Sequence, residues 1–152
     1  MHLCNLRPKS RGAVTLNSSD SHKPPVIQFN YAEHPEDIQV MIKAVKLGRS
    51  IFAEQSLSNL TKQERSPGND VQSDEDIEQF IREKAETIYH PVGTCKMGFD
   101  EEAVVDDKLR VHGVKKLRVV DASVMPFVNS GNTHATVIAI ADKAAGLIKA
   151  VD

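Results

Sequence analysis

The sequence predicts an α+β fold, and three patterns along the chain indicate it. Short N-terminal stretches alternate apolar and polar residues, as half-buried strands do. Three longer stretches repeat apolar residues every three or four positions, as amphipathic helices do. Short extended runs around a turn follow near the C-terminus. With 152 residues, the chain is long enough for one domain with a core.

The composition is that of an ordinary globular chain, with 40% hydrophobic and 26% charged residues and a net charge of −2. It lacks the clustered basic excess of nucleic-acid-binding proteins, so we expect no nucleic-acid partner. The longest apolar run, residues 135–141, is too short to cross a bilayer, so no membrane segment is predicted. Cys4 and Cys95 make no disulfide framework, and the N-terminus lacks a signal peptide's apolar region. These features favour a cytoplasmic protein.

Two strands are predicted near the N-terminus, at residues 12–17 and 26–31. The polar segment between them ends in Pro24-Pro25, which predicts a turn. Two strands alone offer too little pairing for an independent sheet, so we expect a partner strand from elsewhere.

Two helices are predicted next. Residues 34–37 (His-Pro-Glu-Asp) signal a helix start, because proline suits the first turn and acids complement the helix dipole. This helix should end at about residues 52–54. Ser73 predicts the N-cap of the second helix, with Asp76 completing an imperfect capping box. We expect the second helix to bury Ile77, Phe80, Ile81, Ala85 and Ile88 and to continue to Tyr89-His90, where Pro91 and Gly93 stop it.

Two short strands are predicted at residues 108–111 and 117–121, around a turn at residues 112–114. The last helix should begin near Asn132-Thr133 and end around Lys149. Its apolar residues predict an inward face of Val137, Ile138, Ala141, Ala144, Ala145 and Ile148.

Two stretches carry side chains suited to chemistry, and we expect them to face each other. Residues 89–97 place His90 in a loop, where it can be a general acid or base or an ordinary histidine at a helix end. Residues 129–134 open the last helix, where free backbone amides can bind an anionic oxygen or phosphate. Asn132 or Thr133 can equally serve as a helix cap, although capping does not account for His134.

Other kinds of site fit these residues less well. Ser130, His134 and Asp121 include the residue types of a catalytic triad, but Ser130 lacks the Gly-x-Ser-x-Gly elbow. A metal site at His90 and Cys95 would lack two ligands, so no metal is predicted. Neither the glycine-rich dinucleotide fingerprint nor a P-loop is present.

Residues 89–97, Tyr-His-Pro-Val-Gly-Thr-Cys-Lys-Met, resemble the His-Pro-x-Gly-Thr-x-x-Met signature of the glucose-methanol-choline (GMC) oxidoreductases. The choline dehydrogenase and alcohol dehydrogenase branch is the most similar. Further segments that resemble the family occur in the same order as in its members: residues 6–12, 25–31, 104–106, 109–113, 117–126 and 130–135. The resemblance covers nearly the whole chain but only the C-terminal portion of the family's two-domain fold.

The resemblance implies how the chain is divided. Residues 1–88 would supply mostly strands and helices of the substrate domain, including part of its sheet. Residues 89–152 would supply the active-site loop, the closing strand at residues 117–122 and the last helix of the FAD domain. The N-terminal Rossmann unit, which carries the family's glycine fingerprint, is expected to be absent from this chain.

The resemblance also implies an FAD-dependent enzyme that takes the hydroxyl proton of an alcohol and transfers its carbinol hydride to flavin N5. His90 matches the family's histidine near the flavin, the expected base, and His134 matches the second position of that pair. The expected cofactor-binding residues are Asp121 and Ala122 near the ribityl and pyrophosphate groups, and Asn132, Thr133 and Ala135 beneath the flavin ring. Cys95 and Lys96 lie at variable motif positions and receive no role.

We expect the full FAD site to require an N-terminal region outside these 152 residues, and the isolated chain to be inactive. The alternative is a catalytically inactive remnant, or one piece of a split protein that needs an N-terminal partner chain. Besides a small-molecule alcohol, the expected partners are an N-terminal GMC half or a second copy of the chain.

Overall fold

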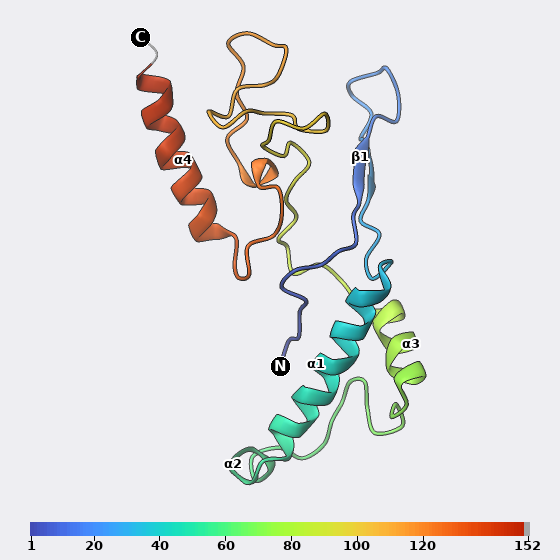
Figure 1. Cartoon of the computed structure of the whole chain (residues 1–152). Coiled ribbons are helices and arrows are strands. Elements are labelled where there is room, and N and C mark those ends of the chain that lie inside the picture. Colours follow the sequence, from blue (N-terminus) through green and yellow to red (C-terminus); the bar gives the residue numbers. More distant parts are fainter. Residues whose placement is uncertain (151–152) are drawn as a thin grey trace. The chain divides into compact units, whose positions relative to one another are not determined.

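The computed structural model describes residues 1–150 and combines helices with a small antiparallel sheet (Figure 1). This mixture confirms the predicted α+β class. The chain divides into two compact units, Met1–Glu86 and Thr87–Asp152. The assignment of residues 1–88 and 89–152 to a substrate domain and an FAD domain stays a prediction.

The sheet of the first unit pairs β1 (Ala13–Thr15) with β2 (Val26–Gln28) in antiparallel register, with Val14 opposite Ile27. Both strands are shorter than predicted and are exposed along their length. Gly12 permits the close approach of the two strand segments, because a Cβ atom there would overlap the carbonyl oxygen of Gln28. Within the described residues no third strand joins this sheet, so the expected partner strand is not found there.

Helix α1 (Pro35–Ala53) begins and ends where the sequence predicts. The His34 side chain accepts a hydrogen bond from the Glu36 backbone N–H and caps the helix. Asp37 is buried, and its carboxylate accepts hydrogen bonds from the backbone and hydroxyl groups of Ser10 and from the Lys9 N–H. Burial opposes the charge of Asp37, but these hydrogen bonds outweigh it and hold its pKa below the usual value. Asp37 thereby anchors the N-terminal segment to α1.

The core of the first unit lies between α1 and α3 (Asp74–Lys84), with the short helix α2 (Gln55–Ser58) after α1. Ser73 caps α3 as predicted, and Asp76 completes the box by accepting from the Ser73 N–H. A carboxylate one methylene shorter than glutamate therefore suffices. The buried residues of this core come from both helices and are Ile38, Ile42, Val45, Ile77 and Ile81.

The prediction that this helix continues to Tyr89 is wrong. Helix α3 ends at Lys84, and Ala85 is already extended with ψ of 132°. Arg82 and Lys84 in the last turn suit the negative end of the helix dipole. Ile88 is 49% exposed, so its side chain gains little burial that would favour another helical turn. Pro91 and Gly93 therefore do not end the helix.

The second unit contains isolated bridges in place of the two predicted strands, including the pair Arg110 and Arg118. The N–H of Val111 donates to Leu117, and that of Val119 donates to Leu109. Leu109 and Lys116 have φ angles of 63° and 61°, which interrupt the extended backbone. Residue 122 begins the 3-10 helix η1 (Ala122–Val124), and the closing strand that the resemblance implies at residues 117–122 stays a prediction, because its neighbouring strands are expected outside this chain.

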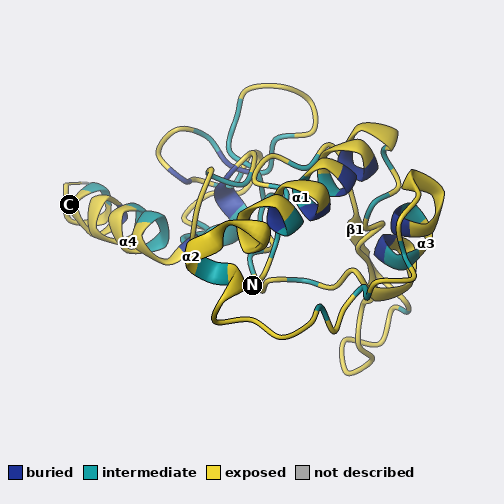
Figure 2. Ribbon diagram, turned by 90° about the horizontal axis from the view of Figure 1, so that it is seen from below, coloured by how far each residue is buried: buried dark blue, intermediate teal, exposed yellow. Residues whose placement is uncertain are grey.

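Helix α4 (His134–Lys149) confirms the predicted last helix and packs on a core of Val105, Leu109 and Val124 through Ala144. Its predicted inward face is partly wrong. Val137 is half-buried, but Ile138, Ala141, Ala145 and Ile148 are exposed, and much of α4 is yellow in Figure 2. Positions 137, 140 and 144 form the packed stripe because they follow the helical repeat from Val137. None of the helices in residues 1–150 has the length and apolar character to cross a membrane.

Candidate active site

The loop that carries His90 is held against residues 122–126 by backbone hydrogen bonds. The N–H of Cys95 donates to Ser123 at 3.0 Å, and the N–H of Met97 donates to Val124 at 2.8 Å. Gly93 has φ of +90°, and a Cβ atom there would lie 3.4 Å from the carbonyl oxygen of Met125. The loop can follow this path because glycine tolerates the positive φ.

Lys96 stabilises the C-terminal end of the loop through two ion pairs. Its ammonium group pairs with Asp100 at 2.8 Å and with Glu102 at 3.3 Å. The hydrogen bond to Asp100 is the main cause that raises the pKa of Lys96. Lys96, for which the sequence predicts no role, therefore holds the loop to the segment that follows it. The signal available in the sequence is the spacing of four residues between Lys96 and Asp100.

His90 is half-buried and makes no hydrogen bond within the described part of the chain. Both ring nitrogens are therefore available for a ligand. His134 is exposed, and only its backbone N–H is bonded, to Oδ1 of Asn132 at 3.0 Å. The two histidines belong to the same unit, and no hydrogen bond joins them within residues 1–150. That they face each other stays a prediction.

The N-terminus of α4 contains the other predicted cofactor residues. Thr133 is buried at the N-cap and makes no side-chain cap hydrogen bond, while Ala135 is exposed in the first turn. The side chain of Asn132 accepts a hydrogen bond from the His134 N–H, and this is the capping role that the sequence left open. The first turn contains no acidic residue. This end of the helix suits an electron-rich group.

Asp121 and Ala122 directly precede the residue to which the loop of His90 is bonded, because the carbonyl oxygen of Ser123 accepts a hydrogen bond from the Cys95 N–H. Asp121 caps η1, and its Oδ1 accepts hydrogen bonds from the backbone and hydroxyl groups of Ser123. Its Oδ2 has no partner among the described residues, so it can still accept from a ligand hydroxyl. Ala122 is half-buried and presents no polar side chain.

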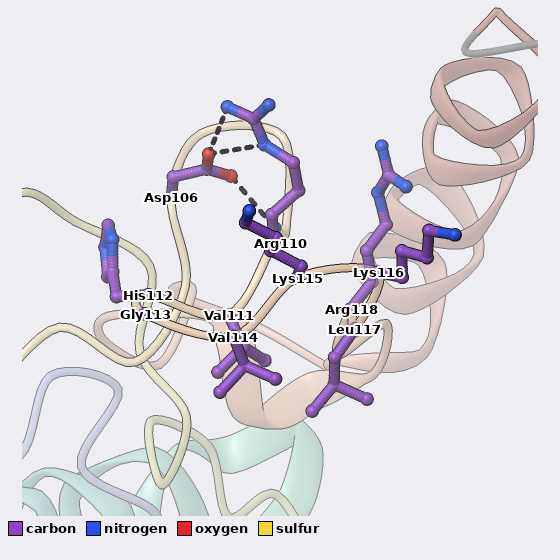
Figure 3. Close-up of a pocket in the computed structure, with 10 residues that line it drawn as sticks. All are labelled: Asp106, Arg110, Val111, His112, Gly113, Val114, Lys115, Lys116, Leu117 and Arg118. Carbon is purple, nitrogen blue, oxygen red and sulfur yellow. Dashed lines mark hydrogen bonds and ion pairs between the residues drawn. The ribbon is translucent and has the colours of Figure 1, made fainter.

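A pocket in the same unit is lined by Asp106 and residues 110–118 and contains none of the predicted site residues (Figure 3). Asp106 and Arg110 form its ion pair, with Nη2 and Oδ2 2.6 Å apart. Burial opposes the charge of Asp106, but the hydrogen bonds of Arg110 and Lys108 lower its pKa to about 2. In Figure 3, Val114 and Leu117 point away from Arg110 and Arg118, so polar and apolar side chains separate to opposite sides. Asp106 thus stabilises this turn.

Comparison with known proteins decides the family. A family model for the C-terminal region of the GMC oxidoreductases matches residues 8–141. The chain belongs to the GMC oxidoreductase family. It is 50% identical over 148 residues to an alcohol dehydrogenase [acceptor] of Pseudomonas putida, covering 97% of this chain and 27% of that protein. It is 49% identical to an oxygen-dependent choline dehydrogenase of Cronobacter sakazakii, covering 97% of this chain and 26% of that protein.

Two solved structures are similar over nearly the whole of this chain. Formate oxidase of Aspergillus oryzae superposes with a TM-score of 0.89 at 34% identity, over 95% of this chain and 26% of that one. An FAD-dependent oxidoreductase of Chaetomium thermophilum gives 0.89 at 35% identity, over 95% and 25%. The predicted resemblance to the choline and alcohol dehydrogenase branch of a flavoprotein family is confirmed. The chain spans about a quarter of the length of these relatives.

Proposed function

We propose that this chain supplies the catalytic edge of an FAD-dependent enzyme that oxidises the CH–OH group of an alcohol. Membership of the GMC family, with relatives named alcohol dehydrogenase and choline dehydrogenase at about 50% identity, is the observation that carries the proposal. The geometry supports it, because the loop of His90 is held against the segment that begins at Asp121 and Ala122.

The residues present fit FAD. The start of α4 has neither an acidic residue in its first turn nor a side-chain cap from Thr133, so the amides that follow His134 can stabilise negative charge. Asp121 keeps a free carboxylate oxygen for a sugar-alcohol hydroxyl. We therefore assign Asp121, Ala122, Asn132, Thr133 and Ala135 to the surface that holds FAD.

Bound FAD supplies an acceptor for the hydride that leaves the carbinol carbon. His90 accepts the hydroxyl proton, because its half-buried imidazole has no hydrogen-bond partner among the described residues and keeps a ring nitrogen free for the alcohol. As the O–H and C–H bonds break, the carbinol becomes a carbonyl. His134 holds the same oxygen from the start of α4, and two groups on one oxygen orient the C–H bond.

A polypeptide equivalent to the N-terminal part of the family's fold is the partner we propose. The curated relatives extend over nearly four times the length that this chain matches. Ile138, Ala141, Ala145 and Ile148 form an exposed apolar stripe on α4, and β1 and β2 have no further strand beside them in the described residues. Burying such surfaces stabilises an assembly through the hydrophobic effect and strand pairing.

Reconstitution tests the proposal. The chain is co-expressed with the N-terminal region of the Pseudomonas putida relative, and the complex is purified by gel filtration. We expect co-purified FAD with a flavin spectrum that bleaches when an alcohol is added anaerobically. The 152-residue chain alone should emerge without FAD. A complex that binds FAD but is not bleached by any alcohol of a broad panel would instead support the inactive remnant.

A further inference from the structure

Asn129 joins the loop before α4 to the first turn of α4. Its side-chain nitrogen donates to the carbonyl oxygen of Asn132 at 3.2 Å and to Oγ1 of Thr136 at 2.9 Å. A carboxamide has two N–H groups, so both hydrogen bonds can exist together. The two bonds span the helix start on either side of His134.

A third hydrogen bond extends this connection to His134 itself. While Asn129 holds the backbone of Asn132, the side chain of Asn132 accepts from the His134 N–H at 3.0 Å. Thr133 contributes no side-chain cap. The two asparagines therefore replace a conventional cap and determine where the backbone of His134 lies.

The orientation of the Asn129 carboxamide follows from its neighbours. The Asn132 carbonyl oxygen can only accept, so the nitrogen of Asn129 must point toward it. This leaves Oδ1 of Asn129 buried without a partner in the described residues. An unpaired buried acceptor is unfavourable, and an apolar side chain would avoid the cost. What asparagine provides here is the pair of hydrogen bonds to Asn132 and Thr136.

We propose that Asn129 is a positioning residue for His134, acting through Asn132 and Thr136 on the alcohol-oxidising site. This inference rests on the proposed function. Without Asn129, the loop and the first turn of α4 separate, and the backbone that carries the His134 imidazole shifts relative to the alcohol oxygen. A displacement of about 1 Å at such a group can slow a reaction by about a hundredfold.

The first test measures the local geometry in the 152-residue chain, without cofactor. In Asn129→Ala, NMR should show amide exchange at His134 about 5-fold faster, as expected for the loss of one net hydrogen bond. Thr136→Val replaces only the hydroxyl group by a methyl group and should also speed exchange at His134, whereas Thr136→Ser retains the acceptor and should match wild type. Asn17→Ala, at an exposed asparagine, is the matched control.

Unchanged exchange at His134 in both Asn129→Ala and Thr136→Val would overturn the inference. If Asn129→Ala fails to fold, the Thr136→Val and Thr136→Ser pair decides the question. Equal exchange in those two variants would likewise overturn it.

The second test uses the reconstituted FAD complex. Asn129→Ala should lower the limiting rate of flavin reduction about tenfold while leaving the alcohol concentration at half-maximal rate nearly unchanged. Thr136→Ser should retain the wild-type limiting rate that Thr136→Val loses. If His134→Ala slows flavin reduction but Asn129→Ala does not, the positioning role is wrong although the proposed function stands. If His134→Ala has no effect, the assignment of His134 fails, whatever the exchange rates show.

Discussion

The backbone N–H of Cys95 donates to the carbonyl oxygen of Ser123 at 3.0 Å, which places the loop of His90 beside the segment that follows Asp121. The two partners are 28 residues apart in the sequence, and neither side chain is needed for the bond. The relationship therefore depends on backbone geometry, above all at Gly93.

Replacing His90 tests the proposed base. In the reconstituted complex, His90→Ala should slow flavin reduction by 10²- to 10⁴-fold, the usual range for loss of a general base. FAD should remain bound, because His90 is not among the residues assigned to the cofactor. Stopped-flow absorbance measures the rate, and His22→Ala, in an exposed turn, is the control. Wild-type reduction by His90→Ala would refute the assignment.

Gly93→Ala should destabilise the second unit by about 1–2 kcal/mol, because an L-residue at positive φ is strained. Hydrogen-exchange mass spectrometry over residues 87–150 reports this unit separately. Gly146→Ala is the matched control, since a Cβ atom there meets nothing within 4 Å and alanine favours a helix. It should leave the unit as stable or more so. Equal protection in the two variants would contradict the role given to Gly93.

The lowered pKa of Asp106 predicts how the second unit responds to acid. The folded value is about 2, against 3.8 for the ordinary carboxyl group. The contribution of the ionised Asp106 carboxylate to the free energy of unfolding is therefore present above about pH 4 and is lost as pH falls toward 2. The side chain of Asp106 is 13% exposed, and the shift corresponds to about 2 kcal/mol.

Asp106→Asn should remove most of that stability at pH 7 and flatten the pH dependence between 4 and 2. The urea midpoint, followed through the NMR signal of the buried residue Val105, measures both effects. Asp107→Asn, at the neighbouring exposed carboxylate, should leave the pH dependence in place. The same loss of midpoint in both variants would point to net charge instead of the Arg110 pair.

The exposed stripe of α4 predicts separate effects on stability and assembly. Ile138→Gln with Ile148→Gln should leave the isolated chain about as stable as wild type, since these side chains are 56% and 50% exposed. The same change should weaken co-purification with the N-terminal GMC region. Ala144→Gln, which places a large polar side chain in the core, should destabilise the chain itself. Undiminished co-purification of the Ile138/Ile148 double variant would exclude this stripe as the interface.

Local signals in the sequence predicted the long helices well. His34, and Ser73 with Asp76, are capping groups that act through hydrogen bonds to residues only two or three positions away. The end of α3 and the inward face of α4 were less predictable. Whether Ala85 and Ile88 join a helix depends on whether a core exists to cover them, and that information is not local.

The sequence by itself determined the family and the residues that we propose for the site, because the motif around His90 and the segments that follow it occur in order. Only the tertiary structure decided how those residues are held. It showed the backbone bonds from Cys95 and Met97, the capping role of Asp121 and the contacts of Asn129. The physical reason is that such bonds join groups by their position in space, whereas motif spacing records only their position along the chain.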